Sequence, residues 1–193
     1  AWRRSLRARG FTNFELTGGM EVKLRARVDL FVREGRYQLV VSEVDPAYTV
    51  GAIARMRERT VAMLKASGLL ERNKALELVP VPLHVGLVTS VGSAAYRDFT
   101  SILSQSGYAF SIHVFDAHMQ GERTAIEVVR GIETLASLKT LDVIVIVRGG
   151  GAKTDLLAFD DISICRAVAA CPLPVITGIG HETDLTVTDL VAH

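Results

Sequence analysis

The stretch "VIVIVRGGGAKTDLLAFDD", residues 143–161, joins five consecutive apolar residues to an arginine and three glycines. A short, continuously apolar run of β-branched residues predicts a strand that is buried on both faces. The glycines predict a tight turn, and the pattern from Thr154 onward predicts that this turn leads into a helix. Strand, turn and helix in this order are the repeating unit of an α/β fold.

The same order recurs along the chain beyond Pro82. We expect parallel strands at residues 84–89, 110–115, 143–147 and 174–177. We expect helices at residues 93–104, 122–138 and 154–170, with a last helix opening near Asp184. Alternating strands and helices with apolar strands predict a doubly wound, mostly parallel, Rossmann-like sheet covered on both faces.

The N-terminal part has a different pattern. Residues 20–28 alternate apolar and polar side chains, which predicts a strand with one buried face and with Lys23, Arg25 and Arg27 on its outer face. A turn at residues 33–36 then leads into a second strand at residues 37–44. The pattern predicts an antiparallel β unit of about three strands, too few to close a barrel.

Between these parts, the spacing of Ile53, Met56, Met63 and Leu64 predicts an amphipathic helix from Thr49 to Leu70. We therefore divide the chain into a β unit at residues 1–48, a helical linker at residues 49–79 and an α/β domain at residues 80–193. Charge follows this division, because residues 1–75 carry a net charge of +7 and residues 76–193 carry −6. A basic part joined to an acidic part is compatible with a polyanion-gripping module attached to a catalytic one, or with a solvated basic face.

Composition excludes several classes of protein. No apolar run is long enough to span a bilayer, and the start lacks the apolar segment of a signal peptide. It also lacks an initiator methionine, which is typical of a segment of a longer protein. The two cysteines, Cys165 and Cys171, are expected to be reduced, buried thiols in a cytoplasmic protein.

Loops that follow parallel strands gather at one edge of the sheet, where ligands bind. In the loop after residue 147, glycine N–H groups and Arg148 suit an anion, although a simple tight turn explains Gly149, Gly150 and Gly151 equally well. A Walker loop is excluded by Val147 and Ala152, and Thr154 leaves only a partial dinucleotide fingerprint.

The loop "GIGHETD", residues 178–184, contains His181 between small and acidic residues. Histidine suits acid–base chemistry near neutral pH, and a neighbouring carboxylate can orient it. The structural alternative is that Thr183 or Asp184 caps a helix beside a loop histidine. No HExxH zinc motif or GxSxG serine elbow occurs.

Four stretches together resemble the large subunit family of bacterial exonuclease VII. They are "VGLVTSVGSAAYRDF", "HMQGERTAIEVVRGIE", "DVIVIVRGGGAKTDLLAFDD" and "PVITGIGHETDLTVTDLVAH". The stretch "GMEVKLRARVDLFVREGRYQLVVSEVDP" is similar to the closing strands of that family's N-terminal OB-fold. The resemblance implies that the chain begins inside the OB-fold and stops before a helical region that recruits several copies of a small subunit.

The resemblance also implies an activity, the hydrolysis of single-stranded DNA from both ends into oligonucleotides. Carried over by motif, the catalytic positions are Asp98, Arg148, His181 and Asp184. From their place in the loops after the strands, Ser90 and the three glycines are expected to contact the phosphate. Asp98 would position water or, with Asp184, hold Mg²⁺ if the site uses a metal. Whether a metal is needed stays open, because the sequence lacks the dense carboxylate cluster of a two-metal site.

Two alternatives remain beside the nuclease. The first is a non-catalytic single-stranded nucleic-acid-binding module, with basic strands for grip and the glycine loop as an anion site. The second is a small-molecule nucleotide-binding protein built on the parallel sheet.

Overall fold

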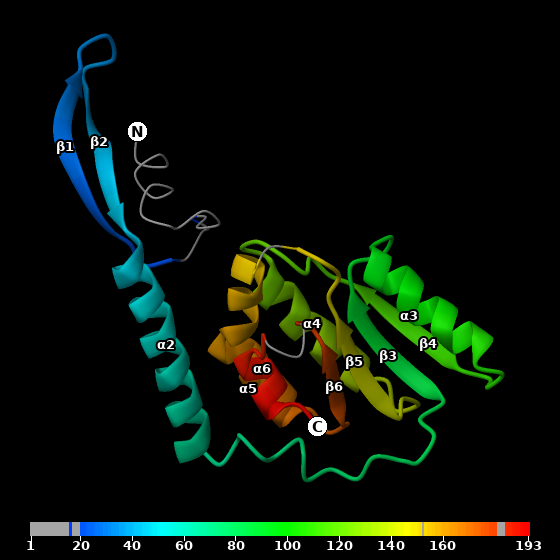
Figure 1. Ribbon diagram of the computed structural model, residues 1–193. Coiled ribbons are helices and arrows are strands. Elements are labelled where there is room, and N and C mark those ends of the chain that lie inside the picture. The colour runs from blue at the N-terminus through cyan, green and yellow to red at the C-terminus, as the bar shows by residue number, and fades with distance from the viewer. Residues whose placement is uncertain (1–15, 17–19, 152, 181–183) are drawn as a thin grey trace. The chain divides into compact units, whose positions relative to one another are not determined.

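The computed structural model describes residue 16 and residues 20–151, 153–180 and 184–193 (Figure 1). The chain divides into two compact units, Ala1–Glu58 and Arg59–His193. The division at residues 48 and 79 into β unit, linker and catalytic domain stays a prediction.

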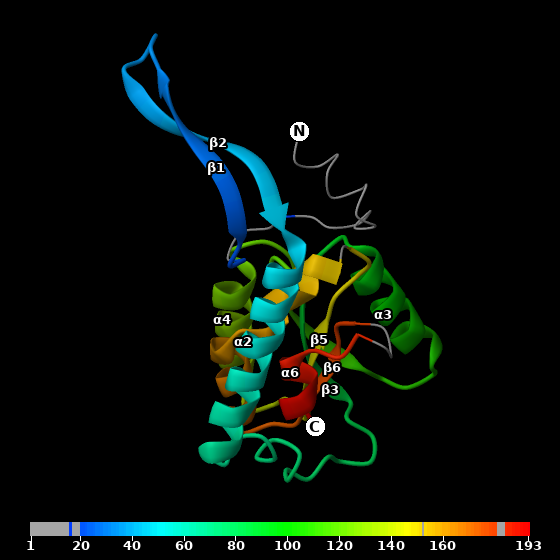
Figure 2. The ribbon, with the colours of Figure 1, turned by 60° about the vertical axis from the view of Figure 1, so that its left-hand side comes forward.

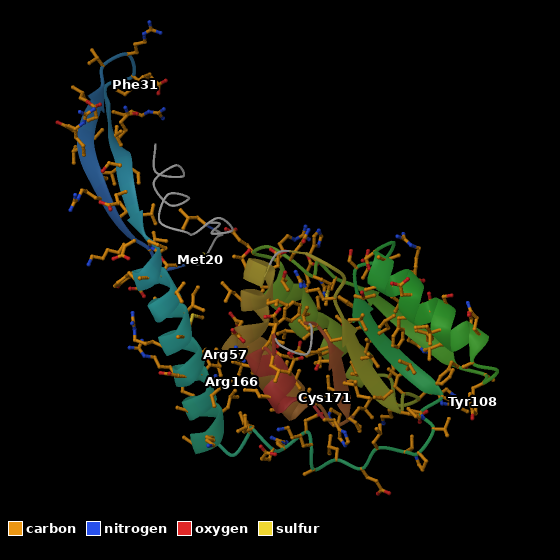
Figure 3. All side chains as sticks on the ribbon, viewed as in Figure 1. Met20, Phe31, Arg57, Tyr108, Arg166 and Cys171 are labelled. Carbon is orange, nitrogen blue, oxygen red and sulfur yellow. The ribbon has the colours of Figure 1, made fainter. Side chains whose placement is uncertain are left out.

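The first unit contains a β-hairpin. Strand β1 (Lys23–Phe31) pairs antiparallel with strand β2 (Arg36–Asp45), as the alternating pattern predicts. Phe31 lies at the end of β1 near the tip of the hairpin (Figure 3), where Gly35 adopts a φ of 63° in the turn. This left-handed conformation carries little penalty in glycine because it has no Cβ atom.

One face of the hairpin is apolar and exposed. In the register of the two strands, Val28 lies opposite Leu39 and Leu30 opposite Tyr37. Val28 is 66 % exposed and Tyr37 is 80 % exposed. Because side chains alternate between the faces of a strand, Lys23, Arg25 and Arg27 lie on the other face. The basic face is confirmed, whereas the apolar face is exposed rather than buried.

Helix α2 (Pro46–Ala66) ends before the predicted limit at Leu70. The cause is Gly68, which adopts a φ of 67°, while the backbone N–H of Leu69 donates to the carbonyl of Leu64 at 2.9 Å. This is a Schellman-type end, in which a glycine beyond the helix satisfies the last carbonyls. Leu64 is fully buried, whereas Met63 is exposed, so the predicted apolar stripe is only partly correct.

The second unit is built on a four-stranded parallel sheet. Its strands are β3 (His84–Thr89), β4 (Ser111–Asp116), β5 (Val143–Val147) and β6 (Val175–Gly178), in the order β4-β3-β5-β6. From β3 the chain moves outward to β4, then crosses back over β3 to β5. The order therefore reverses between β3 and β5, which is where open α/β sheets bind ligands.

Helices cover both faces of this sheet (Figures 1 and 2). Helix α3 (Ala94–Gln105) packs on one face through Tyr96 and Phe99. Helices α4 (Thr124–Ala136) and α5 (Ile162–Ala170) enclose the larger core on the other face. This core is formed by Val88, Ile144 and Ile146 of the sheet, Val128 and Ile132 of α4, and Ile164 and Val168 of α5. The doubly wound α/β prediction is confirmed for this unit.

The single helix predicted at residues 154–170 is instead two segments. The first, η1 (Lys153–Asp160), is a 3₁₀-helix, and α5 follows it. Asp161 separates them because its carboxylate caps α5 by accepting from the backbone N–H of Ser163 at 2.8 Å. Aspartate favours this capping position over a helix interior.

The last helix, α6 (Val187–Val191), begins later than predicted. Thr186 is its N-cap and forms a capping box with Asp189, so the expectation that Thr183 or Asp184 caps this helix is wrong. The box satisfies two N–H groups at once, which an acid at residue 184 could not do from outside the first turn.

A buried asparagine ties the segment after α2 to the sheet. The side chain of Asn73 donates to the carbonyls of Val168 and Leu173 at 3.0 Å and accepts from the N–H of Val175 at 2.8 Å. Residues near 73 therefore belong to the core of the second unit. Among the helices in the described part of the chain, none has the length and apolar character needed to cross a membrane.

Candidate active site

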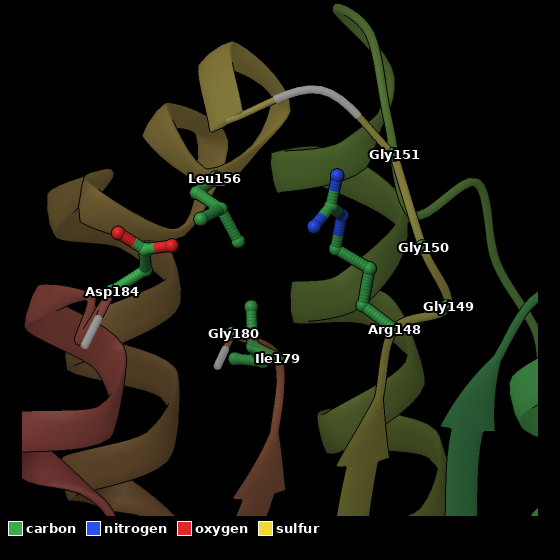
Figure 4. Close-up of a pocket in the computed structure, with 8 residues that line it drawn as sticks. All are labelled: Arg148, Gly149, Gly150, Gly151, Leu156, Ile179, Gly180 and Asp184. Atoms are coloured by element: carbon green, nitrogen blue, oxygen red, sulfur yellow. The ribbon is translucent and has the colours of Figure 1, made fainter. Parts of the chain in front are cut away.

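A pocket of about 330 Å³ lies beyond the carboxyl ends of β5 and β6 (Figure 4). Three segments line the pocket: the loop after β5, the 3₁₀-helix η1 (Lys153–Asp160) and the loop after β6. Its described lining consists of Arg148, Gly149, Gly150, Gly151, Leu156, Ile179, Gly180 and Asp184. Two of the four predicted catalytic residues, Arg148 and Asp184, therefore line the same pocket.

Arg148 is the first residue after β5, and both its backbone and its side chain are held by neighbouring groups. Its backbone N–H donates to the carbonyl of Gly178 at 3.0 Å, which continues the ladder between β5 and β6. Its side chain is only 7 % exposed, and Nη2 lies 3.3 Å from Oδ2 of Asp155. A guanidinium that is buried to this degree needs a counter-ion, because burying an unpaired charge is costly.

The three glycines differ in what surrounds them. A Cβ atom on Gly151 would lie 2.5 Å from Nη2 of Arg148 and 2.9 Å from Oδ2 of Asp155. A Cβ atom on Gly150 would meet nothing within 4 Å. Glycine at residue 151 thus lets the chain pass the ion pair without displacing it, whereas the Cβ position of Gly150 has open space around it.

Gly149 connects the pocket to the point where the strand order reverses. A Cβ atom there would lie 3.5 Å from Cβ of Ala95, in the first turn of α3. Helix α3 follows β3, and its N-cap Ser93 accepts from the N–H of Tyr96 at 3.1 Å. The loops after β3 and β5 therefore approach each other, as expected at a topological switch point.

Asp184 approaches the pocket from the segment after β6, and its carboxylate lies across the pocket from Arg148 (Figure 4). A Cβ atom on Gly180 would lie 2.5 Å from the backbone oxygen of Asp184. Gly180 is therefore required because the chain returns closely past it. His181 lies outside the described residues, so its predicted role stays a prediction.

Two other predicted residues lie apart from the pocket lining. Asp98 is an exposed residue of α3, and it is not among the described residues that line the pocket. Ser90, directly after β3, is half-buried, and its carbonyl accepts from the N–H of Ser93 at 3.1 Å. Both lie on the segment that follows β3. Their predicted roles, phosphate contact for Ser90 and water positioning for Asp98, stay predictions.

The residues of the described ranges do not themselves gather into a metal centre. Among them, no group of three or more His, Cys, Asp or Glu side chains could hold a metal ion. Asp184 lines the pocket while Asp98 is exposed on α3, so these two carboxylates alone do not make the oxygen cage that Mg²⁺ requires.

The predicted basic strand face is exposed and partly paired. Arg25 lies 3.6 Å from Glu43, and Arg27 lies 3.5 Å from Asp29. The ammonium of Lys23 lies 5.8 Å from the ring centre of Tyr48. These side chains carry charge that is accessible to solvent, in contrast to the buried charge of Arg148.

Sequence reasoning missed two features of this edge. Asp155 and Leu156 of η1 contribute a counter-ion and an apolar wall, and the only signal was an acid seven residues after the arginine. A second cluster follows β4, where Glu127 binds His118 at 2.7 Å and Arg123 at 2.6 Å. The N–H of His118 also donates to Glu127, and this bond is the main reason that the pKa of Glu127 is lowered.

The cysteines are free and buried, as the sequence predicts. Burial raises the pKa of Cys165 to about 11. A thiol with this pKa is protonated at neutral pH, so Cys165 is unsuited to nucleophilic catalysis.

Comparison with known proteins identifies the relatives of this chain. The family described as "Exonuclease VII, large subunit" matches residues 69–193. An exodeoxyribonuclease 7 large subunit from Moorella thermoacetica is 41 % identical over 186 residues, which cover 96 % of this chain and 46 % of that protein. The corresponding subunit from Nitrosomonas europaea is 37 % identical over 174 residues, covering 90 % of this chain and 39 % of that protein.

The chain thus spans less than half the length of these relatives. The family match extends from residue 69 to residue 193 and so includes β3 to α6, with the whole parallel sheet, the glycine loop and the described lining of the pocket. The chain belongs to the exonuclease VII large subunit family.

Proposed function

We propose that the protein of which this chain is a part hydrolyses phosphodiester bonds of single-stranded DNA from both ends and releases oligonucleotides. The observation that carries this proposal is the buried, counter-ion-bound Arg148 at a pocket lined by three glycines and Asp184. The family, whose relatives are named exodeoxyribonuclease 7 large subunit, supports it independently.

Arg148 stabilises the charge that develops on the phosphoryl oxygens. A guanidinium presents N–H donors in a rigid fork that matches two phosphate oxygens. Because the side chain is held before substrate arrives, little reorganisation is needed in the transition state. The open space at Gly150 lets a phosphate backbone approach the loop closely.

The proton transfers are assigned to the loop after β6. His181 acts as the general base for water or as the acid for the leaving oxygen, since imidazole exchanges protons near neutral pH. Asp184, which lines the pocket, orients His181. Asp98 positions the attacking water from α3.

The mechanism uses no step through a metal. Magnesium bound by Asp98 and Asp184 would stabilise charge on phosphoryl oxygens, a task that Arg148 already performs. Because the sequence lacks the dense carboxylate cluster of a two-metal site, we propose that a metal is optional and expect activity to persist in a chelator.

The hairpin β1–β2 is proposed to be part of an OB-fold that binds single-stranded DNA. Its exposed apolar face, with Val28, Tyr37 and Leu39, is suited to packing against further strands, as inside a β-barrel. The opposite face holds DNA phosphates through Lys23, Arg25 and Arg27, and aromatic side chains stack on bases.

The partners are proposed to be single-stranded DNA and several copies of the exonuclease VII small subunit. We place the protein in the cytoplasm. Buried, unpaired cysteines are typical of a reducing compartment.

The experiment is a nuclease assay on end-labelled single-stranded DNA with the full-length large subunit and its small partner. The wild-type complex is expected to release oligonucleotides from both ends, with and without EDTA. Arg148→Ala is expected to lower kcat by about 10²- to 10³-fold, as for loss of one oxyanion-stabilising donor. Tight DNA binding without cleavage by the wild-type complex would favour the non-catalytic module instead.

A further inference from the structure

Arg148 and Asp155 form the most deeply buried of the ion pairs found in the described part of the chain. Their side chains are 7 % and 19 % exposed, whereas the exposed pair Arg25–Glu43 has values of 81 % and 29 %. Nη2 of Arg148 lies 3.3 Å from Oδ2 of Asp155. Water screens such a buried pair weakly, so the carboxylate strongly influences where the guanidinium rests.

The backbone is shaped around this pair. The Cβ atom that Gly151 lacks would lie 2.5 Å from Nη2 of Arg148 and 2.9 Å from Oδ2 of Asp155. The chain therefore passes directly against both charged groups, and a methyl group at residue 151 would push the ends of the two side chains aside. This close packing limits the space through which the guanidinium can move.

Asp155 is carried by a segment that is anchored at its far end. Phe159 of η1 is fully buried, and its carbonyl accepts from Oγ1 of Thr188 at 2.6 Å. The carboxylate of Asp160 accepts from the N–H of Val187 at 2.6 Å. These bonds connect the end of η1 to the start of α6. Asp155 is therefore part of a segment that is anchored to the core.

We propose that Asp155 is a positioning residue that directs the guanidinium of Arg148 into the pocket toward the phosphate of the bound strand. Asp155 acts through Arg148 and does not contact the reacting atoms. A guanidinium has five N–H donors, so contact with Asp155 through Nη2 is compatible with a further bidentate contact to phosphate. This inference rests on the proposed nuclease function.

If Asp155 positions Arg148, removing its charge should lower kcat while leaving KM nearly unchanged. Without Asp155 the guanidinium keeps its charge but loses its fixed direction, so ground-state attraction for DNA changes little while alignment in the transition state is lost. Asp155→Asn is therefore expected to lower kcat by about 10- to 100-fold, since misplacement by about 1 Å can cost about 10²-fold, and to leave KM within about threefold.

The test is a double-mutant cycle in the full-length complex. Wild type, Asp155→Asn, Arg148→Ala and the double variant are compared on end-labelled single-stranded DNA. If Asp155 acts through Arg148, Asp155→Asn lowers kcat by less than about twofold in the Arg148→Ala background. Asp142→Asn is the matched control, because Asp142 pairs with His84 at 3.1 Å at the opposite edge of the sheet, and its kcat is expected to equal that of wild type.

Chemical rescue separates positioning from a structural role. Free guanidinium ion, at concentrations below those that denature the complex, is expected to restore activity to Arg148→Ala while Asp155 is present to hold it. In the double variant Arg148→Ala/Asp155→Asn, this restoration is expected to fall by about tenfold or more. Asp155→Glu, which keeps the charge, is expected to recover part of the kcat that Asp155→Asn loses, even if Asp155→Asn also lowers the melting temperature.

Additive losses of kcat in the cycle, or equal guanidinium rescue with and without Asp155, would overturn the inference. So would a kcat of Asp155→Asn within twofold of wild type. A wild-type complex that does not cleave single-stranded DNA would instead refute the proposed function. The two failures are distinct, because the first requires an active wild type.

Discussion

Two groups of cations in this chain are predicted to meet phosphate, and the structure gives them opposite environments. Arg148 is 7 % exposed and is held by Asp155 at a pocket. In the hairpin, the side chains of Arg25 and Arg27 are 81 % and 76 % exposed. A buried, oriented cation can stabilise a transition state, whereas exposed, mobile cations mainly supply salt-dependent attraction.

The contrast between Arg148 and the hairpin cations shows that residue type alone does not decide whether a cation acts in catalysis or in binding. In the sequence, both groups are basic residues within or directly after strands. Burial and a counter-ion separate them, since a held charge costs no reorganisation during reaction, while a solvated charge is screened and must be ordered on binding. The following changes test that separation, from the largest expected effect to the smallest.

The largest effect in this series is expected from a methyl group at Gly151. Gly151→Ala pushes against Arg148 and Asp155, so kcat is expected to fall by about 10²-fold through misplacement of the guanidinium. Single-turnover cleavage by the full-length complex is the measurement.

Gly150→Ala is the matched control, because its methyl group would meet nothing within 4 Å. It is expected to keep the wild-type melting temperature and to weaken DNA binding through crowding of the pocket, with a smaller loss of kcat. Equal kcat losses in the two variants would show that the pocket does not depend on the geometry of the ion pair.

An intermediate effect is expected from the exposed cations. Replacing Lys23, Arg25 and Arg27 together by Gln should weaken single-stranded DNA binding and reduce the slope of log K against log salt by about 2, at about 0.7 per phosphate contact. Binding titrations at several salt concentrations measure this slope, and kcat should not change.

The charge-matched control replaces Arg130, Lys139 and Arg166, which are exposed residues of the second unit, by Gln. A similar loss of affinity in this control would mean that net charge rather than the hairpin face holds DNA. An unchanged salt slope in the hairpin variant would contradict a role for its basic face.

The smallest effect concerns the carboxylate of Glu127, which is paired at the surface. Its pKa is lowered, first by the N–H of His118 and then by the side chain of His118. A lowered carboxyl pKa stabilises the fold fully above the ordinary value of 4.5, and the stabilisation is lost as pH falls through the lowered pKa.

Glu127→Gln is therefore expected to lower the melting temperature slightly at neutral pH, with the difference from wild type vanishing as pH falls below 4.5. Thermal unfolding of this chain across pH measures it. Glu133→Gln, an exposed carboxylate on the same helix, is the control and should show no such trend. A difference that persists at low pH would indicate lost packing rather than lost charge.

Local pattern was sufficient for much of the fold. Residues 84–89 and 143–147 are strands with the predicted limits, because short β-branched runs flanked by turn residues have few other stable arrangements. The break between η1 and α5 was not predictable from periodicity, since it depends on Asp161 acting as a cap and on Asp160 bonding to Val187 from a distant segment.

For the site, the sequence by itself determined that Arg148, the glycines and Asp184 follow parallel strands and so reach one edge of the sheet. Only the tertiary structure decided that Arg148 is buried, that Asp155 is its counter-ion and that the backbone at Gly151 passes against this ion pair. The physical reason is that the strands and the loops that follow them obey local sequence pattern, whereas the order of the strands, β4-β3-β5-β6, is set by long-range packing. Burial and ion pairing depend on segments that are distant in the sequence, such as η1, which carries Asp155 and is bonded to the start of α6.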